Sequence, residues 1–165
     1  MRALPLDRLA LGCEAEAMKP CLYVDLAPPD PDYAAGYICR LTGDCESIVR
    51  LDLPAERIEL PFRLFERFDG GLCRITLRSG YAWNWASIPV LSRWSWWRRQ
   101  APYWYRASGN HDAGYQSIED GAFPPSYRAE FDRIMRECLA EDGSPFARRW
   151  LDWAGVRAFG WAAIR

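Results

Sequence analysis

The sequence holds one histidine, His111, and the residue that follows it is the carboxylate Asp112. An imidazole paired with a carboxylate suits general acid–base catalysis, because the carboxylate sets the tautomer and stabilises the imidazolium. A second carboxylate, Asp132, lies in the next segment with a helical pattern, and antiparallel packing would bring it against the ring. We therefore predict that His111 and Asp132 form a catalytic pair separated by no more than about 8 Å.

The neighbours of His111 supply candidates for a metal site. Adjacent helical residues diverge by about 100°, so Asp112 is expected to point away from His111 and to hold a cation while His111 faces a reacting water. Asn84, in the polar loop 80–91, is the second metal-ligand candidate, and Ser87 in the same loop offers a further polar atom.

A structural interpretation of these residues stays open. A histidine beside an aspartate is often a hydrogen-bonding group of the fold, and a polar loop is often an ordinary turn. Asp132 also has Arg128 and Arg136 four residues before and after it, so it can pair along its own helix.

The segment 93–105 interleaves aromatic and arginine side chains. This pattern suits a membrane interface, a surface on which nucleic-acid bases stack, or a protein partner. A small domain also needs large rings to fill its core, so core and interface remain equal alternatives. The interface candidates are Trp94, Trp96 and Trp97.

The composition bounds the class of protein. The chain has 165 residues, of which 50% are hydrophobic and 26% are charged, and its formal net charge is -1. These values are typical of one soluble globular domain and exclude a wholly disordered chain. No uncharged apolar stretch of about 18 residues is present, so no transmembrane helix is expected. The near-neutral charge argues against a protein that coats nucleic acid.

The six cysteines show no C-x-x-C pair, and one histidine is available to complete a metal site. A zinc site is therefore not expected, because its ligands usually come in close pairs. Asp7 and Arg8 interrupt the apolar run at the N-terminus, so no signal peptide is expected either. We expect reduced, mostly buried cysteines.

The first half of the chain has the pattern of a small sheet. Residues 1–35 are irregular and include a proline cluster that cannot lie inside a helix. Residues 36–83 contain short runs rich in β-branched and aromatic residues, and Asp69-Gly70-Gly71 predicts a hairpin between two of them.

The second half has a helical pattern, with helices expected over 103–117, 126–141 and 144–162. Ser126 is the predicted N-cap of the second helix, and Gly143 is expected to close its C-terminal end. Its predicted core stripe is Phe131, Ile134, Met135, Cys138 and Leu139. The order predicts an α+β fold: a small antiparallel β-sheet followed by two or three C-terminal helices.

Four motifs in this order resemble a family of uncharacterised proteins of tailed bacteriophages and prophages. The family pattern is a G-F-x-T-D-x-A-S-I/V-P loop, an H-D-x-x-Y helix, an R-x-x-x-D helix and a closing A-V-R-x-x-G segment. The resemblance covers residues 60–165, and residues 1–60 are an N-terminal extension with the first strands; one compact unit is expected. The matching residues are Gly80 to Pro89, His111, Asp112, Tyr115, Arg128, Asp132, Val156, Arg157 and Gly160.

The resemblance implies that Ser87, Tyr115 and Arg128 support the site. The chain departs from the pattern where the usual Thr-Asp becomes Trp83-Asn84, which replaces a carboxylate with an amide. A cation site or acid–base function that depends on that carboxylate would be weakened in this member.

The His–Asp helix and the Asp-bearing helix after it also resemble the core of phospholipase A2 enzymes, over about 30 residues. This resemblance implies that His111 activates water, that Asp112 binds Ca²⁺ and that Asp132 holds the imidazole. Calcium would polarise the ester carbonyl. The Gly-rich calcium loop of that family and the cysteine before its histidine are missing here.

Two classes of function follow. The phage resemblance implies a protein made in the bacterial host cytoplasm and carried in the virion, with a role in tail assembly or host interaction and with other phage or host proteins as partners. The alternative is a calcium-assisted esterase or lipase that acts on a lipid or cell-envelope surface with His111 as general base. Nucleic acid is not an expected partner.

Overall fold

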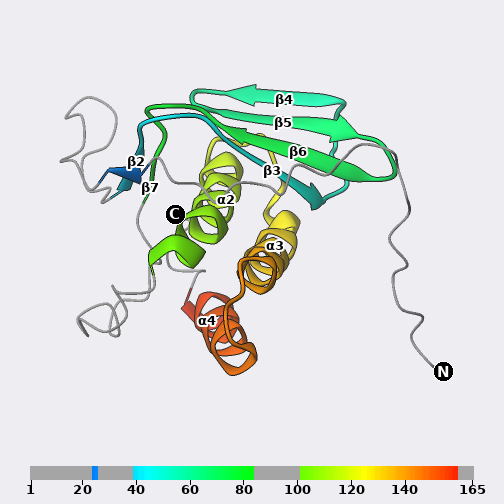
Figure 1. Ribbon diagram of the computed structural model, residues 1–165. Coiled ribbons are helices and arrows are strands. Elements are labelled where there is room, and N and C mark those ends of the chain that lie inside the picture. The colour runs from blue at the N-terminus through cyan, green and yellow to red at the C-terminus, as the bar shows by residue number, and fades with distance from the viewer. Residues whose placement is uncertain (1–23, 26–38, 84–100, 160–165) are drawn as a thin grey trace.

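The computed structural model describes residues 24–25, 39–83 and 101–159 and has an α+β arrangement (Figure 1). An antiparallel sheet region precedes three helices, as the sequence pattern predicts. The helices are α2 (Ala101–Glu119), α3 (Arg128–Glu141) and α4 (Phe146–Phe159). Within the described part of the chain, no helix is long and apolar enough to cross a membrane.

The larger sheet has four strands in the order β3-β6-β5-β4, and all its pairs are antiparallel. The predicted hairpin joins β5 to β6, with Phe68 opposite Leu72. Gly70 and Gly71 adopt φ values of 72° and 77°, which glycine tolerates without a steric penalty. The strands are β3 (Cys45–Arg50), β4 (Arg57–Leu60), β5 (Arg63–Phe68) and β6 (Leu72–Leu77).

A smaller sheet of three short strands lies beside the first. It pairs β1 (Val24–Asp25) with β2 (Cys39–Leu41), and β2 with β7 (Ala82–Trp83). The expectation that residues 1–35 are wholly irregular is wrong at β1. Two residues are too short a run to produce an alternating pattern, so this strand depends on its partner β2.

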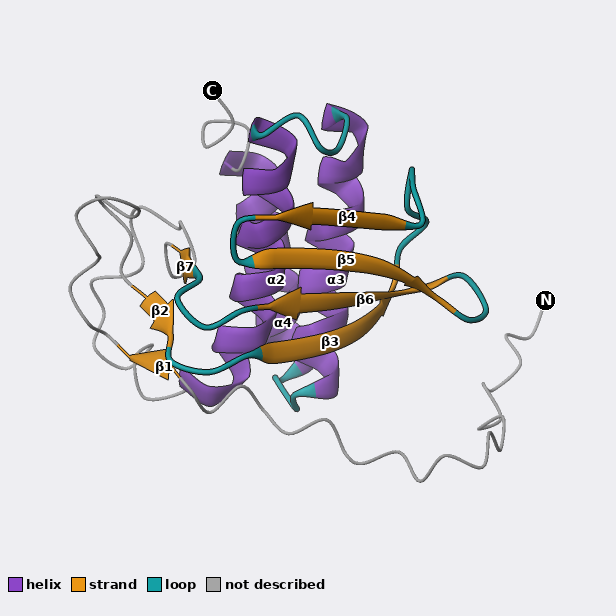
Figure 2. Ribbon diagram, turned by 90° about the horizontal axis from the view of Figure 1, so that it is seen from above, coloured by secondary structure: helices purple, strands orange, loops and turns teal. Residues whose placement is uncertain are grey.

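Helices α2 and α3 pack side by side on one face of the four-stranded sheet, and α4 packs on α3 on the side away from the sheet (Figures 1 and 2). Alternation along β3 buries Cys45, Ser47 and Val49 toward the helices. The predicted stripe of α3 is buried throughout. The rings of Phe65, Phe123 and Phe131 meet edge to face between sheet and helices.

The helix ends differ in part from the expected ones. Ser126 is not an N-cap, because Pro125–Tyr127 form a 3₁₀ turn and α3 begins at Arg128 without a side-chain cap. Proline suits the first position of such a turn, which moves the α-helical start beyond Ser126. Gly143 does close α3, with a φ of 84°.

The cysteines correct a second expectation. Cys73 and Cys138 are free and buried, and burial raises the pKa of Cys73 to about 12 and of Cys138 to about 11. Cys45, in contrast, is disulfide-bonded to a cysteine whose side chain lies outside the described part. Spacing could not reveal this bond, because disulfide connectivity does not follow from sequence positions alone.

Candidate functional site

The site lies between α2, which carries His111, and α3, which carries Asp132. The two helices run antiparallel and approach closely at Gly114, where a Cβ atom would overlap the Phe131 ring. Phe131 directly precedes Asp132, so the close contact at Gly114 also sets the depth at which the carboxylate meets α2. Glycine at this position thus serves packing and site geometry together.

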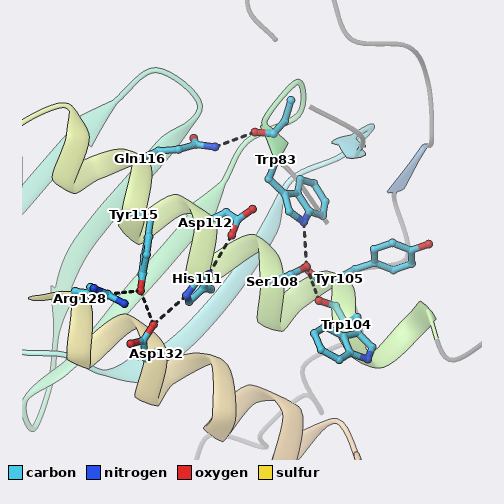
Figure 3. A network of polar contacts seen from close by, with 11 residues as sticks. Trp83, Trp104, Tyr105, Ser108, His111, Asp112, Tyr115, Gln116, Arg128 and Asp132 are labelled. Atoms are coloured by element: carbon cyan, nitrogen blue, oxygen red, sulfur yellow. Dashed lines mark hydrogen bonds and ion pairs between the residues drawn. The ribbon is translucent and has the colours of Figure 1, made fainter. Parts of the chain in front are cut away.

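Asp132 is the centre of the polar network. It is 0% exposed, and its Oδ1 atom lies 3.0 Å from His111 Nε2 and accepts a hydrogen bond of 2.7 Å from the Tyr115 hydroxyl (Figure 3). Its Oδ2 atom accepts a hydrogen bond of 3.0 Å from Arg157 on α4. Burial alone would raise the pKa of Asp132, but His111, Tyr115 and Arg157 together lower it. The predicted proximity of His111 and Asp132 is confirmed.

His111 is clamped between two carboxylates. Its Nδ1 atom lies 3.0 Å from Asp112 Oδ1, on the side opposite the contact with Asp132 (Figure 3). Burial alone would lower the pKa of His111, but the hydrogen bonds to Asp112 and Asp132 outweigh it and raise the pKa to about 9. The imidazole is therefore an imidazolium at neutral pH.

This contact corrects the expectation that Asp112 points away from His111. The divergence of about 100° applies to the Cα–Cβ bonds, whereas side-chain torsions bring the carboxylate back to the ring. A buried imidazolium favours such a rotamer, because the second carboxylate offsets the loss of hydration.

Tyr115 and Arg128 buttress the carboxylate. The Tyr115 ring lies 4.3 Å from the His111 ring, and its hydroxyl accepts a hydrogen bond of 2.9 Å from Arg128 Nε. Arg128 also donates to the backbone oxygen of Arg157. Burial and the nearby Asp132 raise the pKa of Tyr115, so its hydroxyl stays protonated and able to donate.

The open possibility that Asp132 pairs along its own helix is not what the structure shows. Arg128 donates to Tyr115, and Arg136 lies over the rings of Trp150 and Trp153 at 4.4 and 5.4 Å. The arginine that pairs with Asp132 is Arg157, which comes from a different helix.

Sequence reasoning assigned no role to Gly114 or Arg157. Both lie inside the quoted motifs, Gly114 within H-D-A-G-Y and Arg157 within G-V-R. Glycine in mid-helix was the available signal for Gly114, because it costs helix stability unless close packing requires it. For Arg157 the sequence offers no comparable signal, because its pairing depends on how α4 packs on α3.

The remaining predicted residues lie outside the described residues and stay predictions. They are Asn84, Ser87, Trp94, Trp96 and Trp97. The chain leaves β7 beside the middle of α2, because Gln116 donates to the Ala82 oxygen at 3.2 Å and the Trp83 indole donates to Ser108 at 3.0 Å (Figure 3). Among the described side chains, no group of three or more His, Cys, Asp or Glu could hold a metal ion.

The fold and the site define an α+β domain in which three helices converge on a buried His–Asp–Tyr network closed by two arginines. The chain belongs to the family described as Protein of unknown function (DUF1353), which it matches over residues 62–156. That range runs from the turn before β5 to α4 and contains every residue of the network except Arg157, which directly follows it. No curated protein and no solved structure matches the chain significantly.

Proposed function

We propose that the network is the centre of an ester hydrolase in which His111 moves the proton. The observation that carries this proposal is the orientation of the ring: Asp132, held by Tyr115 and Arg157, binds Nε2, which directs Nδ1 toward Asp112. A ring fixed at one nitrogen by a buried carboxylate is the arrangement that a general base requires.

The proposed reaction is hydrolysis by an activated water. Neutral His111 takes a proton from water at Nδ1 while the water oxygen bonds to the ester carbonyl carbon. The imidazolium then returns the proton to the leaving alkoxide as the ester C–O bond breaks, which yields an acid and an alcohol. Asp132 stays ionised throughout and stabilises the imidazolium.

Asp112 controls the availability of Nδ1 in this mechanism. Its side chain is 13% exposed, and its carboxylate occupies the position that the water would need. Release of Asp112, by deprotonation of His111 or by a cation that attracts the carboxylate, would open the position. A calcium ion at Asp112 remains part of the proposal, with Asn84 as the second candidate ligand.

The test measures hydrolysis of p-nitrophenyl esters and of phospholipid vesicles, with calcium and with chelator. We expect activity to increase as the pH approaches 9, because His111 must lose its proton to act as a base. His111→Gln and Asp132→Asn should abolish it, whereas Phe68→Ser, on the exposed sheet face, should not change it. Folded wild-type protein that hydrolyses no substrate under either condition would overturn the proposal.

A second candidate is a non-catalytic protein in which the same network serves the fold. The specific observation in its favour is that His111 is charged and held on both sides, which joins α2, α3 and, through Arg157, α4. This contact supports a structural role for the network, and the motif resemblance alone supports a phage- or prophage-encoded protein of the virion or of host interaction. Mass spectrometry of purified particles tests the virion role. If the protein is absent from the particles, host interaction is the role that remains.

The two candidates predict different effects of His111→Ala. A catalytic histidine contributes mainly to the transition state, so its loss should remove activity and change stability little. A structural imidazolium leaves two buried carboxylates facing each other without a cation between them. In that case the melting temperature should drop strongly, and the wild-type protein should show no hydrolysis.

A further inference from the structure

The solvent-facing side of α4 is apolar, whereas its inner side carries charge. Facing inward are Asp152, 1% exposed, and Val156, with Arg148 close to Asp152. This is the reverse of an ordinary surface helix, which turns its polar residues to water. The exposed residues of α4 whose side chains are described are Phe146, Ala147, Trp150, Leu151, Ala154, Arg157 and Ala158.

The largest of these side chains form one patch on the first half of the helix. Phe146 is 66% exposed, Leu151 is 57% exposed and Trp150 is 39% exposed. The rings of Phe146 and Trp150 lie 6.1 Å apart, Leu151 follows Trp150 in the sequence, and Figure 1 shows that α4 is the helix farthest from the four-stranded sheet. A contiguous exposed apolar patch on a soluble domain usually marks a surface that binds something.

Two arginines lie over the rings of the patch. The Arg149 guanidinium lies 5.0 Å from the centre of the Phe146 ring, and Arg136 of α3 lies 4.4 Å from that of Trp150. Asp152 is the one acidic residue in the sequence of α4, and it is buried. The apolar patch is therefore flanked by cations, and α4 itself presents no carboxylate to solvent.

We propose that this face of α4 binds a membrane surface that contains anionic phospholipid. Phe146, Trp150 and Leu151 would enter the boundary between headgroups and acyl chains, while Arg149 and Arg136 contact lipid phosphates. A helix of 14 residues would lie flat in this boundary. The inference does not depend on the proposed hydrolase activity.

Two other occupants fit the patch less well. A second copy that packed through the same face would set Arg149 and Arg136 against the arginines of its partner, with no exposed carboxylate on α4 to offset them. Nucleic acid would pair with the arginines and stack on Trp150, but it offers little to the aliphatic Leu151.

The test is flotation of the full chain with vesicles of phosphatidylcholine alone and of phosphatidylcholine mixed with phosphatidylglycerol. We expect binding to the mixed vesicles, weak or no binding to the neutral ones, and a loss of binding as salt is raised. The double variant Phe146→Ser/Leu151→Ser should bind the mixed vesicles at least about tenfold more weakly, because two apolar side chains no longer enter the lipid.

Phe68→Ser is the matched control. Phe68 is 38% exposed and has Arg74 5.0 Å from its ring centre, so it resembles the patch in chemistry but lies on the sheet. Its loss should leave vesicle binding unchanged. Wild-type protein that does not float with the mixed vesicles would overturn the proposal. A double variant that dissociates a dimer, or that melts at a much lower temperature, would overturn it too, because another copy or another part of this chain would then cover the face.

Discussion

Asp132 on α3 and Asp152 on α4 are buried almost equally, at 0% and 1% exposure, but their surroundings differ. Asp132 receives hydrogen bonds from His111, Tyr115 and Arg157. Asp152 pairs with Arg148 at 3.6 Å, and neither of its oxygens has a hydrogen bond within the described part of the chain. Burial raises the pKa of Asp152 to about 6, whereas the pKa of Asp132 is lowered.

The two carboxylates are equally buried, so the difference between their pKa values follows from the number of hydrogen-bond donors around each one. At Asp132 the donors are His111 and Tyr115 of α2 and Arg157 of α4, so the ionised carboxylate on α3 joins three helices. At Asp152 the counterion Arg148 is four residues away on the same helix, so this ion pair stays within α4. We therefore expect stability to depend strongly on Asp132 and weakly on the pair at Asp152.

The largest effect is expected for Asp132→Ala. Removal of this carboxylate leaves the Tyr115 hydroxyl without its acceptor and Arg157 without its counterion, and it removes one of the two anions that hold the His111 imidazolium. We expect the free energy of unfolding to fall by about 3–5 kcal/mol. Urea denaturation measures it, and Tyr115→Phe, which removes one donor, should cost only about 1 kcal/mol. Equal losses in the two variants would contradict the central role of Asp132.

The next largest effect is the dependence of the free energy of unfolding on pH, which His111 introduces. Its pKa is raised from 6.5 to about 9 in the folded protein, so the folded state holds the proton more tightly. The resulting stabilisation is full below pH 6.5 and is lost as the pH rises through 9, which amounts to on the order of 3 kcal/mol.

Denaturation at successive pH values across this window measures the slope. His111→Gln should flatten it. Asp152 has a raised pKa as well, so its ionisation also lowers stability as the pH rises, but between 3.8 and about 6. Asp152→Asn should therefore flatten only the lower window. A wild-type curve without a slope above pH 6.5 would show that the two carboxylates do not hold an imidazolium.

Sequence patterns were sufficient for the parts of this fold that repeat locally. The short β-type runs over 36–83, the glycines of the β5–β6 hairpin and the stripe of α3 each follow a local rule, and all were predicted. The His111–Asp132 contact was also predictable, because two consecutive helices joined by a short turn pack antiparallel. The strand β1 has no local signal, so it could not be predicted.

The rest of the site depends on tertiary packing. Arg157 is placed by the contact of α4 with α3, and the rotamer of Asp112 is set by the charge of the ring beside it. The sequence also offered no indication that α4 turns its apolar side to solvent and its charged side inward. Its aromatic residues have a helical spacing that would suit a core, whereas Phe146 is 66% exposed.

Gly114→Ala tests the close helix contact that brings Asp132 to His111. The new Cβ atom would overlap the Phe131 ring, so α3 must shift and the contact must lengthen. We expect a loss of roughly 2 kcal/mol, within the usual range for overpacking. Gly109→Ala is the control: its Cβ atom would lie 3.2 Å from Leu77, where a small adjustment suffices. Equal stability of the two variants would mean that the approach of α2 to α3 is not tight.

The smallest effect is expected when the pair at Asp152 is replaced by apolar side chains. In Arg148→Met/Asp152→Leu, both buried charges disappear together, so neither is left without a partner. Arg148 lies over the Trp104 ring at 5.6 Å, and a methionine sulfur can keep a contact with that ring. We expect the free energy of unfolding to stay within about 1 kcal/mol of the wild-type value, or to rise.

Asp152→Ala alone is the control, because it removes the carboxylate and leaves the Arg148 charge in place, so it should cost more than the double variant. If the double variant instead loses several kcal/mol, as expected for Asp132→Ala, the pair contributes as much as the network does. The number of hydrogen-bond donors would then not distinguish the two carboxylates, and the charged inner side of α4 would itself hold the helix in place.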